Sequence, residues 1–206
     1  MQKLLLNKII KFAEDEKITQ LFVVIGINNS KSKILMLEKN SIGKWFAIID
    51  TYGYIGKNGL GKAKEGDRKT PIGKFKFNYA FGINDDPGCK IFYHKITNDD
   101  WWSGDERKGY CYNKLIDINN YPNLNKRVSE HLMDYKQEYR YCLNINYNEE
   151  CKIGKGFAIF LHCINPNKHY TSGCVAIPYK DMLKVMKNVK KDCVIIINSF
   201  EEIINL

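Results

Sequence analysis

Residues 157–178, FAIFLHCINPNKHYTSGCVAIP, are the stretch that says most about the fold. Their near-continuous apolar start, over 157–163, is typical of a strand buried on both faces, and it delivers His162 at the end of that strand. A polar loop follows, and a second apolar run begins directly after Cys174. The pattern predicts a strand–loop–strand hairpin with His162 and Cys174 side by side.

This pair of residue types indicates cysteine acyl transfer, in which a thiolate attacks and an imidazole takes the thiol proton. Gly173 permits a tight turn with positive φ, and backbone N–H groups at such a turn can converge on an oxyanion. Pairing should lower the pKa of Cys174 below about 8.5 and raise that of His162 above about 6.5. A lone histidine at a strand end is also a common structural feature, so this segment alone leaves a structural role open.

Strands dominate the sequence on either side of this segment. Short apolar or alternating runs predict strands over 20–27, 33–38, 44–50, 74–81, 140–148 and 193–198, with a turn at 40–43. Between them lie a glycine-rich loop at 53–73 and an irregular stretch at 84–128, and long irregular segments in compact domains are often functional.

Helices are predicted at three places. Apolar residues at helical spacing predict an N-terminal helix within 1–19 and another helix over 180–190, and Ser129 can cap a third over roughly 130–138. We therefore expect a mainly β fold with short helices (α+β), in which the helix of 1–19 packs on a domain formed by 20–206.

Composition limits the class of protein and its partners. With 206 residues, 44% of them apolar, the chain can bury a core without disulfide or metal staples. The 32 Lys and Arg against 23 Asp and Glu give a net charge of +9, which favours anionic partners. Only four of the cations are Arg, the residue on which nucleic-acid recognition depends, so we expect an anionic polymer and not nucleic acid.

The seven cysteines are odd in number and include no Cys-x-x-Cys pair. This spacing predicts neither a disulfide framework nor a metal site, and we expect no cofactor. Beyond the 157–178 segment we interpret the thiols as packing residues, namely Cys89, Cys111, Cys142, Cys151 and Cys193. No apolar run is long enough to span a membrane, and Lys8 and Lys11 interrupt the N-terminal run too early for an export signal.

A second motif lies upstream, in EGDRKTPIGKF at residues 65–75. Gly-Asp-x-x-Thr-Pro-x-Gly-x-Phe, followed downstream by His-x(11)-Cys within Thr-Ser-Gly-Cys, resembles the L,D-transpeptidase catalytic domain (YkuD-like). The resemblance runs from about residue 20 to the C-terminus and includes the segments 53–61, 101–113 and 129–132. It implies a sandwich-like β catalytic domain.

The resemblance also implies residue roles. Cys174 matches the nucleophile and His162 its base, while the backbone carbonyl of Cys163 would orient the imidazole. Gly173 and Cys174 would supply the N–H groups of the oxyanion hole. For substrate binding we expect Thr171 and Ser172 beside the nucleophile, with Asp105, Tyr112 and Asn113 from the irregular segment. The aromatic residues of that segment fit a substrate groove and a core equally well.

The family joins or trims peptidoglycan stem peptides in the cell envelope, outside the cytoplasm. Its nucleophile attacks the carbonyl of the diamino acid at position three and expels the terminal D-amino acid. An amine then resolves the thioester to a 3→3 crosslink, whereas water gives L,D-carboxypeptidase activity. The sequence leaves open transfer, hydrolysis on the same site, and a non-catalytic wall-binding module.

The chain departs from the commoner Ser-His-Gly-Cys signature, which Arg or Asn follows closely. Ser172 stands in place of the second His, and 175–178 contain neither Arg nor Asn. A distinct branch of the family has Ser-Gly-Cys and resembles this chain. Another cation, from the Lys-rich loops, would then have to meet the substrate carboxylate, and His169 is the remaining imidazole of this loop.

Overall fold

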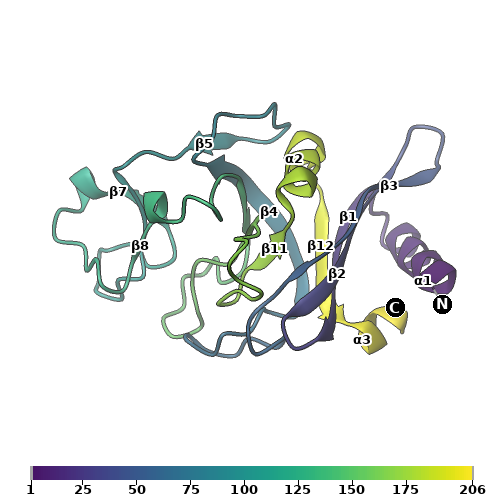
Figure 1. The fold of residues 1–206 in the computed structure, drawn as a ribbon, viewed down its shortest axis with the longest axis horizontal. Helices are drawn as coiled ribbons and strands as arrows, with labels where there is room; N and C mark the ends of the chain where they lie inside the picture. Colours follow the sequence, from purple (N-terminus) through teal and green to yellow (C-terminus); the bar gives the residue numbers. More distant parts are fainter. Residues whose placement is uncertain (1, 206) are drawn as a thin grey trace.

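The computed structural model describes residues 2–205 and is built mainly of strands, as predicted (Figure 1). The ends of the expected segments, Met1 and Leu206, lie outside the described residues. The main sheet contains β1 (Gln20–Asn28), β2 (Lys31–Lys39), β3 (Trp45–Tyr54), β4 (Gly73–Gly82), β5 (Tyr93–Lys95), β9 (Cys142–Ile145), β10 (Phe160–Cys163), β11 (Val175–Ile177) and β12 (Val194–Ser199). Its order is β12-β1-β2-β3-β11-β10-β9-β4-β5, and β4 also pairs with β12, so the sheet closes on itself.

Alternate side chains of β1 enter two different cores. Phe22 and Val24 point into the closed sheet, whereas Leu21 and Val23 point outward into a second apolar cluster. Successive side chains of a strand face opposite ways, so a strand covered on both sides is apolar throughout. This explains the unbroken apolar run at the start of β1.

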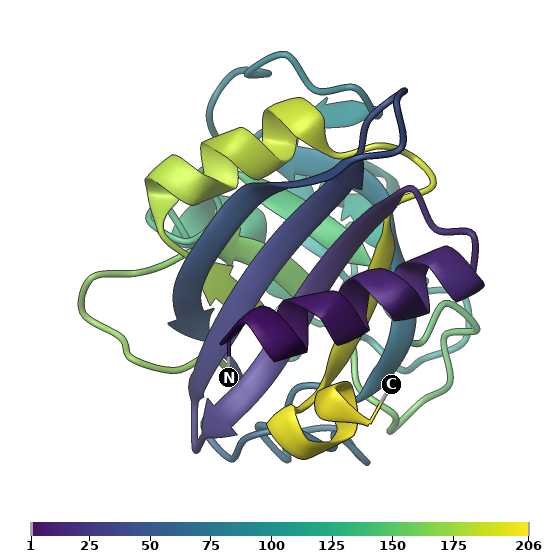
Figure 2. The same cartoon turned by 90° about the vertical axis from the view of Figure 1, so that its right-hand side faces the viewer.

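Helices cover the outer face of this part of the sheet. Figure 2 shows α1 (Gln2–Asp15) lying across β1 and β2, with α3 (Phe200–Ile204) beside it. α1 buries Ile9 and Ala13 completely in the outer cluster. α2 (Tyr179–Asn188) instead buries Met182 in the inner core. Within residues 2–205, no helix has both the length and the apolarity needed to cross a bilayer.

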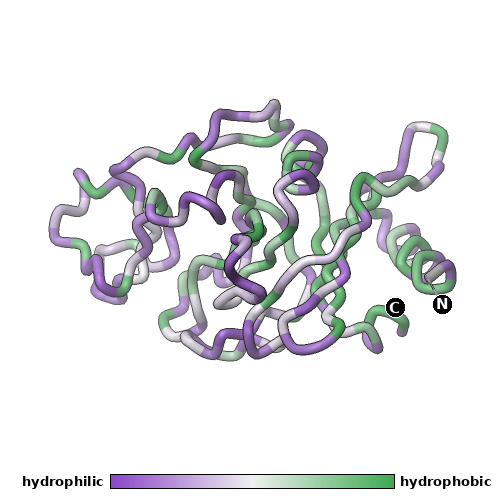
Figure 3. Tube along the Cα trace, in the orientation of Figure 1, coloured by the Kyte–Doolittle hydropathy of each residue, from purple (hydrophilic) through white to green (hydrophobic). Residues whose placement is uncertain are grey.

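The segment predicted to be irregular forms a lobe with a small sheet of its own. The lobe contains β6 (Asp100–Trp102), β7 (Leu115–Asp117) and β8 (Glu130–His131), in the order β7-β6-β8, and two short 3-10 helices, η1 (Ile118–Asn120) and η2 (Leu132–Asp134). Figure 3 shows its trace as largely hydrophilic, while the hydrophobic residues concentrate in the strands of the main sheet.

The helix predicted over 130–138 is wrong. Residues 130 and 131 pair with β6, where the His131 ring stacks on Trp101 with centroids 4.7 Å apart. Ser129 does not cap a helix, because its hydroxyl accepts a hydrogen bond from the Gly104 N–H at 3.1 Å. Long-range pairing with β6 overrides the local helix signal, and only η2 remains helical.

Candidate active site

The segment 157–178 does not form the predicted hairpin, since β10 and β11 run parallel. The loop between them carries the chain back, so that Leu161 lies opposite Val175 and His162 opposite Ala176. Cys174 precedes Ala176 by two residues and therefore shares its face of the sheet. Cys174 and His162 therefore lie on the same face of the sheet, with Cys174 two residues before the residue that pairs with His162.

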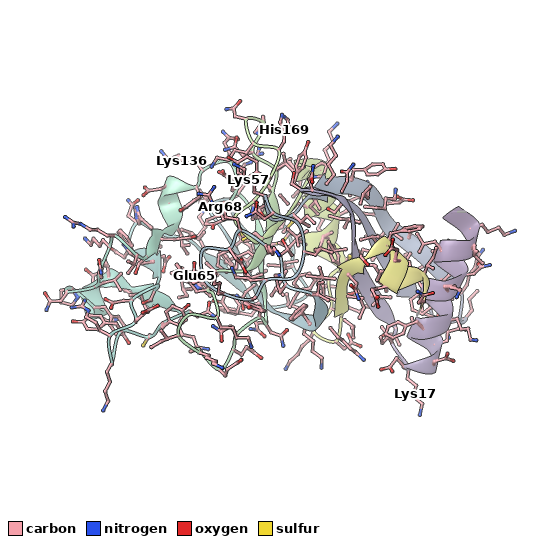
Figure 4. All side chains as sticks on the ribbon, turned by 90° about the horizontal axis from the view of Figure 1, so that it is seen from below. Lys17, Lys57, Glu65, Arg68, Lys136 and His169 are labelled. Atoms are coloured by element: carbon pink, nitrogen blue, oxygen red, sulfur yellow. The ribbon has the colours of Figure 1, made fainter. Side chains whose placement is uncertain are left out.

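Both side chains line one cavity of about 340 Å³. Each is nearly buried, with 9% of Cys174 and 7% of His162 exposed. The wall comes mainly from four parts of the chain: the loop after β3, the lobe, the segment that leads into β10, and the β10–β11 loop. Figure 4 labels Glu65 and Arg68 from this wall in the middle of the molecule, between the lobe and the main sheet, while Lys17 lies far away beside α1.

The imidazole is held in one tautomer. His162 Nδ1 lies 2.8 Å from the backbone oxygen of Cys163. A carbonyl oxygen can only accept, so Nδ1 carries the proton and Nε2 is left with its lone pair. Burial lowers the pKa of His162, which the bond to Cys163 and the Glu138 carboxylate only partly oppose. The resting imidazole is therefore neutral and basic at Nε2.

The thiol is also neutral at rest. Cys174 Sγ donates to the oxygen of Ala158 at 3.1 Å and accepts from the Phe160 N–H at 3.3 Å. Burial raises the pKa of Cys174 to about 12, and the Glu130 carboxylate adds to this, while the Phe160 N–H and Lys62 oppose it. The expected shifts, downward for Cys174 and upward for His162, are wrong, because removal from water outweighs any attraction between the two charged forms.

The loop before the nucleophile is tied by hydroxyl groups. Thr171 Oγ1 donates to the oxygen of Cys174 at 2.7 Å and accepts from the Gly173 N–H at 3.1 Å. Thr70 Oγ1, from the upstream motif, donates to the same Cys174 oxygen at 3.2 Å. The Thr171 hydroxyl therefore stabilises its own loop, and both of its hydrogen bonds are made there. The Gly173 N–H is already hydrogen-bonded at rest. Ser172 is exposed and lines the cavity.

A second cavity, of about 770 Å³, adjoins the first and shares Glu65, Glu130, Tyr135 and Phe157 with it. Asp105 and Tyr112 line this second cavity. The carboxylate of Asp105 is buried against Arg107 Nη2 at 2.7 Å, and this pairing lowers its pKa. The Tyr112 hydroxyl is buried with no protein partner among the described residues.

Asn113, which we expected to bind substrate, is buried and lines neither cavity. Its side chain accepts from Trp102 Nε1 at 3.0 Å and from the Ala158 N–H at 3.1 Å, and it donates to the oxygen of Asn148 at 2.9 Å. These bonds join the lobe to the segment that leads into β10, the strand that carries His162. They also fix Trp102, which is buried against Phe160 and so belongs to the core.

Sequence reasoning did not single out Lys62 or Glu130, although both line the cavity that holds Cys174 and His162. Burial raises the pKa of Glu130 to about 7, despite a hydrogen bond from the Tyr139 hydroxyl at 2.8 Å. Glu130 was visible only as part of the 129–132 motif, and Lys62 was one lysine in a Lys-rich loop. Nothing local in the sequence marks either side chain as facing the thiol.

The other cysteines are free thiols in different settings. Cys142 and Cys193 are buried, and Cys89 and Cys151 are half-buried. Cys111 is exposed, with Sγ 3.0 Å from the Tyr121 hydroxyl, so the expectation that it packs in a core is wrong. Among residues 2–205, no group of three or more His, Cys, Asp or Glu side chains is arranged to hold a metal ion.

The chain matches the model of a known protein family. The family model of the L,D-transpeptidase catalytic domain (YkuD) matches residues 22–197, which is most of the chain and includes both cavity-lining strands, β10 and β11. No curated protein matches the chain significantly.

Proposed function

The chain belongs to the L,D-transpeptidase catalytic domain family, whose members act on peptidoglycan, and we propose that Cys174 is its acyl-transferring nucleophile. The observation that carries this proposal is the fixed imidazole. Because the backbone oxygen of Cys163 accepts from Nδ1–H, the lone pair of His162 is on Nε2, and His162 lines the same cavity as Cys174. A side chain that merely filled space would not require this tautomer.

Acylation begins with both groups neutral. As Sγ of Cys174 attacks the carbonyl carbon of the third residue of the stem peptide, Nε2 of His162 takes the thiol proton. The C–S bond forms and the carbonyl electrons move to oxygen. When this oxyanion collapses, the C–N bond to the terminal D-amino acid breaks and the imidazolium gives its proton to the leaving amine. The enzyme is left as a thioester with a neutral imidazole.

Deacylation repeats these steps with an acceptor. The amine of a second stem attacks the thioester, His162 takes its proton, and Cys174 leaves as a thiolate that recovers that proton. The product is a 3→3 crosslink. The adjoining cavity supports transfer over trimming, because it offers space for a second peptide directly beside the first. There, Asp105 and Tyr112 are our candidates for building the wall beside the acceptor, Asp105 by holding Arg107 in place, and Ser172 is our candidate contact for the donor.

The test is incubation with defined tetrapeptide muropeptides, followed by separation of the products. We expect crosslinked dimers, lost in Cys174→Ala and in His162→Ala but retained in Cys111→Ala, which removes an exposed thiol elsewhere. Tripeptide monomers without dimers would establish an L,D-carboxypeptidase on the same site. Dimers formed by Cys174→Ala would contradict the assignment of Cys174 as the nucleophile. No conversion by the wild-type protein would favour the alternative of a non-catalytic wall-binding module.

We place the action outside the cytoplasm, at the cell envelope, because that is where peptidoglycan is assembled. The net charge of +9 suits a surface rich in anionic wall polymer. Binding to purified cell walls should weaken steeply with salt, since exposed charges are screened within about 10 Å at 0.1 M. Salt-insensitive binding would reject the role of anionic polymer.

A further inference from the structure

Lys62 places a buried cation in the wall of the catalytic cavity. It lies in the loop between β3 and β4, and only 3% of its side chain is exposed. Its Nζ is 3.1 Å from Asp67 Oδ1 and donates to the oxygen of Lys64 at 3.3 Å. An ammonium has three N–H donors, so two are used within the loop and one is left for the cavity.

The loop is built to hold this ammonium. The Asp67 carboxylate accepts from the N–H groups of Ala63, Lys64 and Lys69 as well as from Lys62. Burial alone would raise the pKa of Asp67, but these donors outweigh it and lower the pKa to about 2. The carboxylate therefore stays charged and anchors Lys62 throughout the working range of pH.

One glycine makes room for the lysine, and a second glycine lies beside its ammonium. A Cβ on Gly156 would lie 2.3 Å from Lys62 Cε, so any side chain there would displace the lysine. A Cβ on Gly173 would lie 3.9 Å from Lys62 Nζ. The ammonium thus stands against the residue that directly precedes the nucleophile.

This position matters because one of the two expected oxyanion donors is already engaged. The Gly173 N–H, one of the two expected donors, already donates to Thr171 Oγ1. An oxyanion that forms at the attacked carbonyl therefore needs another positive group nearby, and a cation in a water-poor site interacts strongly with it. The other cations of the cavity are less suited: Lys168 is 55% exposed and pairs with Glu138, and Arg68 is exposed.

We propose that Lys62 is a catalytic residue whose ammonium stabilises the oxyanion formed when Cys174 attacks its substrate. The proposal rests on the proposed function of Cys174. The lowering effect of Lys62 on the pKa of Cys174 is consistent with its closeness to the reacting atoms.

The test compares two reactions of the same thiol. Acylation of Cys174 by a tetrapeptide stem passes through an oxyanion, whereas alkylation by iodoacetamide, mapped to Cys174 by mass, does not. Lys62→Met should lower kcat for acylation by roughly 10²- to 10³-fold, as loss of an oxyanion donor does. The rate of alkylation should fall much less, with a fold-loss at most about one tenth of the fold-loss in acylation. Lys62→Arg should recover part of the loss, and Lys64→Met, an exposed lysine of the same loop, should have little effect.

Acylation by Lys62→Met within twofold of wild type would overturn the proposal. Equal losses in acylation and alkylation would also overturn it, because Lys62 would then act only on the thiol or the loop. If Lys62→Met fails to fold, the acylation and alkylation rates are compared in Lys62→Gln, which keeps a hydrogen-bond donor for Asp67. Conversion of muropeptides by Cys174→Ala would instead reject the nucleophile itself, so the two failures are distinguishable.

Discussion

At the scale of single residues, the neutral state of the Cys174–His162 pair predicts an unusual pH dependence. Burial lowers the pKa of His162 and raises that of Cys174 to about 12. Acylation needs His162 unprotonated and Cys174 still carrying its proton, so its rate should rise through one ionisation below about 6.5 and then stay level to at least pH 9. The pH profile of acylation, followed by intact mass, measures this.

A preformed thiolate–imidazolium pair would behave differently, because deprotonation of the imidazolium would end activity on the alkaline side. A bell-shaped profile with an alkaline fall near pH 8 would therefore contradict the neutral pair. The Glu130 carboxyl also faces the thiol and titrates near pH 7, so the Glu130→Gln variant should be profiled in parallel.

Glu130 predicts a pH-dependent effect on stability. Its pKa is raised to about 7 by burial, so the folded state favours the protonated form. Its contribution is fully present below the unfolded value of about 4.5 and is lost as the pH rises through 7. Glu130→Gln should therefore gain stability relative to wild type between pH 5 and pH 8, by at most about 3 kcal/mol, since water screens part of the effect. Urea unfolding at the two pH values measures it, and an equal difference at both would contradict the assignment.

The sequence was sufficient to identify Cys174 and His162 as candidates, because residue type and order define that motif. It was not sufficient for their pKa values, which depend on burial by segments far away in the chain. Lys62 was missed for the same reason. Its proximity to Gly173 is created by the fold, and its role depends on a glycine at position 156, almost a hundred residues away.

At the scale of elements, strand composition predicted most of the main sheet but not the connection of β10 to β11. An apolar strand, a polar loop and an apolar strand fit both a hairpin and a parallel return. The structure has the parallel return, with β3 on the far side of β11. The predicted helix over 130–138 failed because pairing of β8 with β6 is a long-range contact.

The junction of β3 with β11 predicts a sensitive position at Gly53. A Cβ there would lie 2.2 Å from the oxygen of Ala176 and 2.8 Å from Ile34 Cδ1. Gly53→Ala should push β3 away from β11, cost at least about 2 kcal/mol of stability, and reduce acylation by shifting Cys174. Gly66→Ala is the control: its φ of +74° costs about 1 kcal/mol, but a Cβ meets nothing within 4 Å. Equal losses of stability and activity in the two variants would contradict the packing argument.

At the scale of the whole molecule, the buried apolar residues form three clusters, and only the outer one lies away from the cavity. The inner core and the cluster of the lobe, which includes Cys174, surround the cavity, while α1 and α3 cover the opposite face of β1. The amphipathic pattern of the N-terminal residues predicted a helix within 1–19, and the structure has α1 there. The lobe could not be predicted, because its strands are two or three residues long and become regular only by pairing with each other.

This division predicts that the outer core can be weakened without loss of chemistry. Ile9 of α1 is fully buried in the outer core, so Ile9→Ala should cost about 2–5 kcal/mol of unfolding free energy and leave the acylation rate of the folded protein unchanged. Leu4→Ala, at a side chain that is 58% exposed, should change stability by about 0.5 kcal/mol or less. Chemical denaturation and single-turnover acylation measure the two quantities. A large loss of acylation rate in Ile9→Ala would show that the cores are coupled.

The most direct test of the whole account is the mass of the enzyme during turnover. The protein is mixed with a tetrapeptide stem, quenched with acid, and analysed as intact chain and as peptides. We predict one adduct with the mass of a tripeptide acyl group, located on Cys174 and absent from the other six cysteines. Conversion of the stem peptide with no adduct on Cys174, or with the acyl group on another residue, would contradict the account.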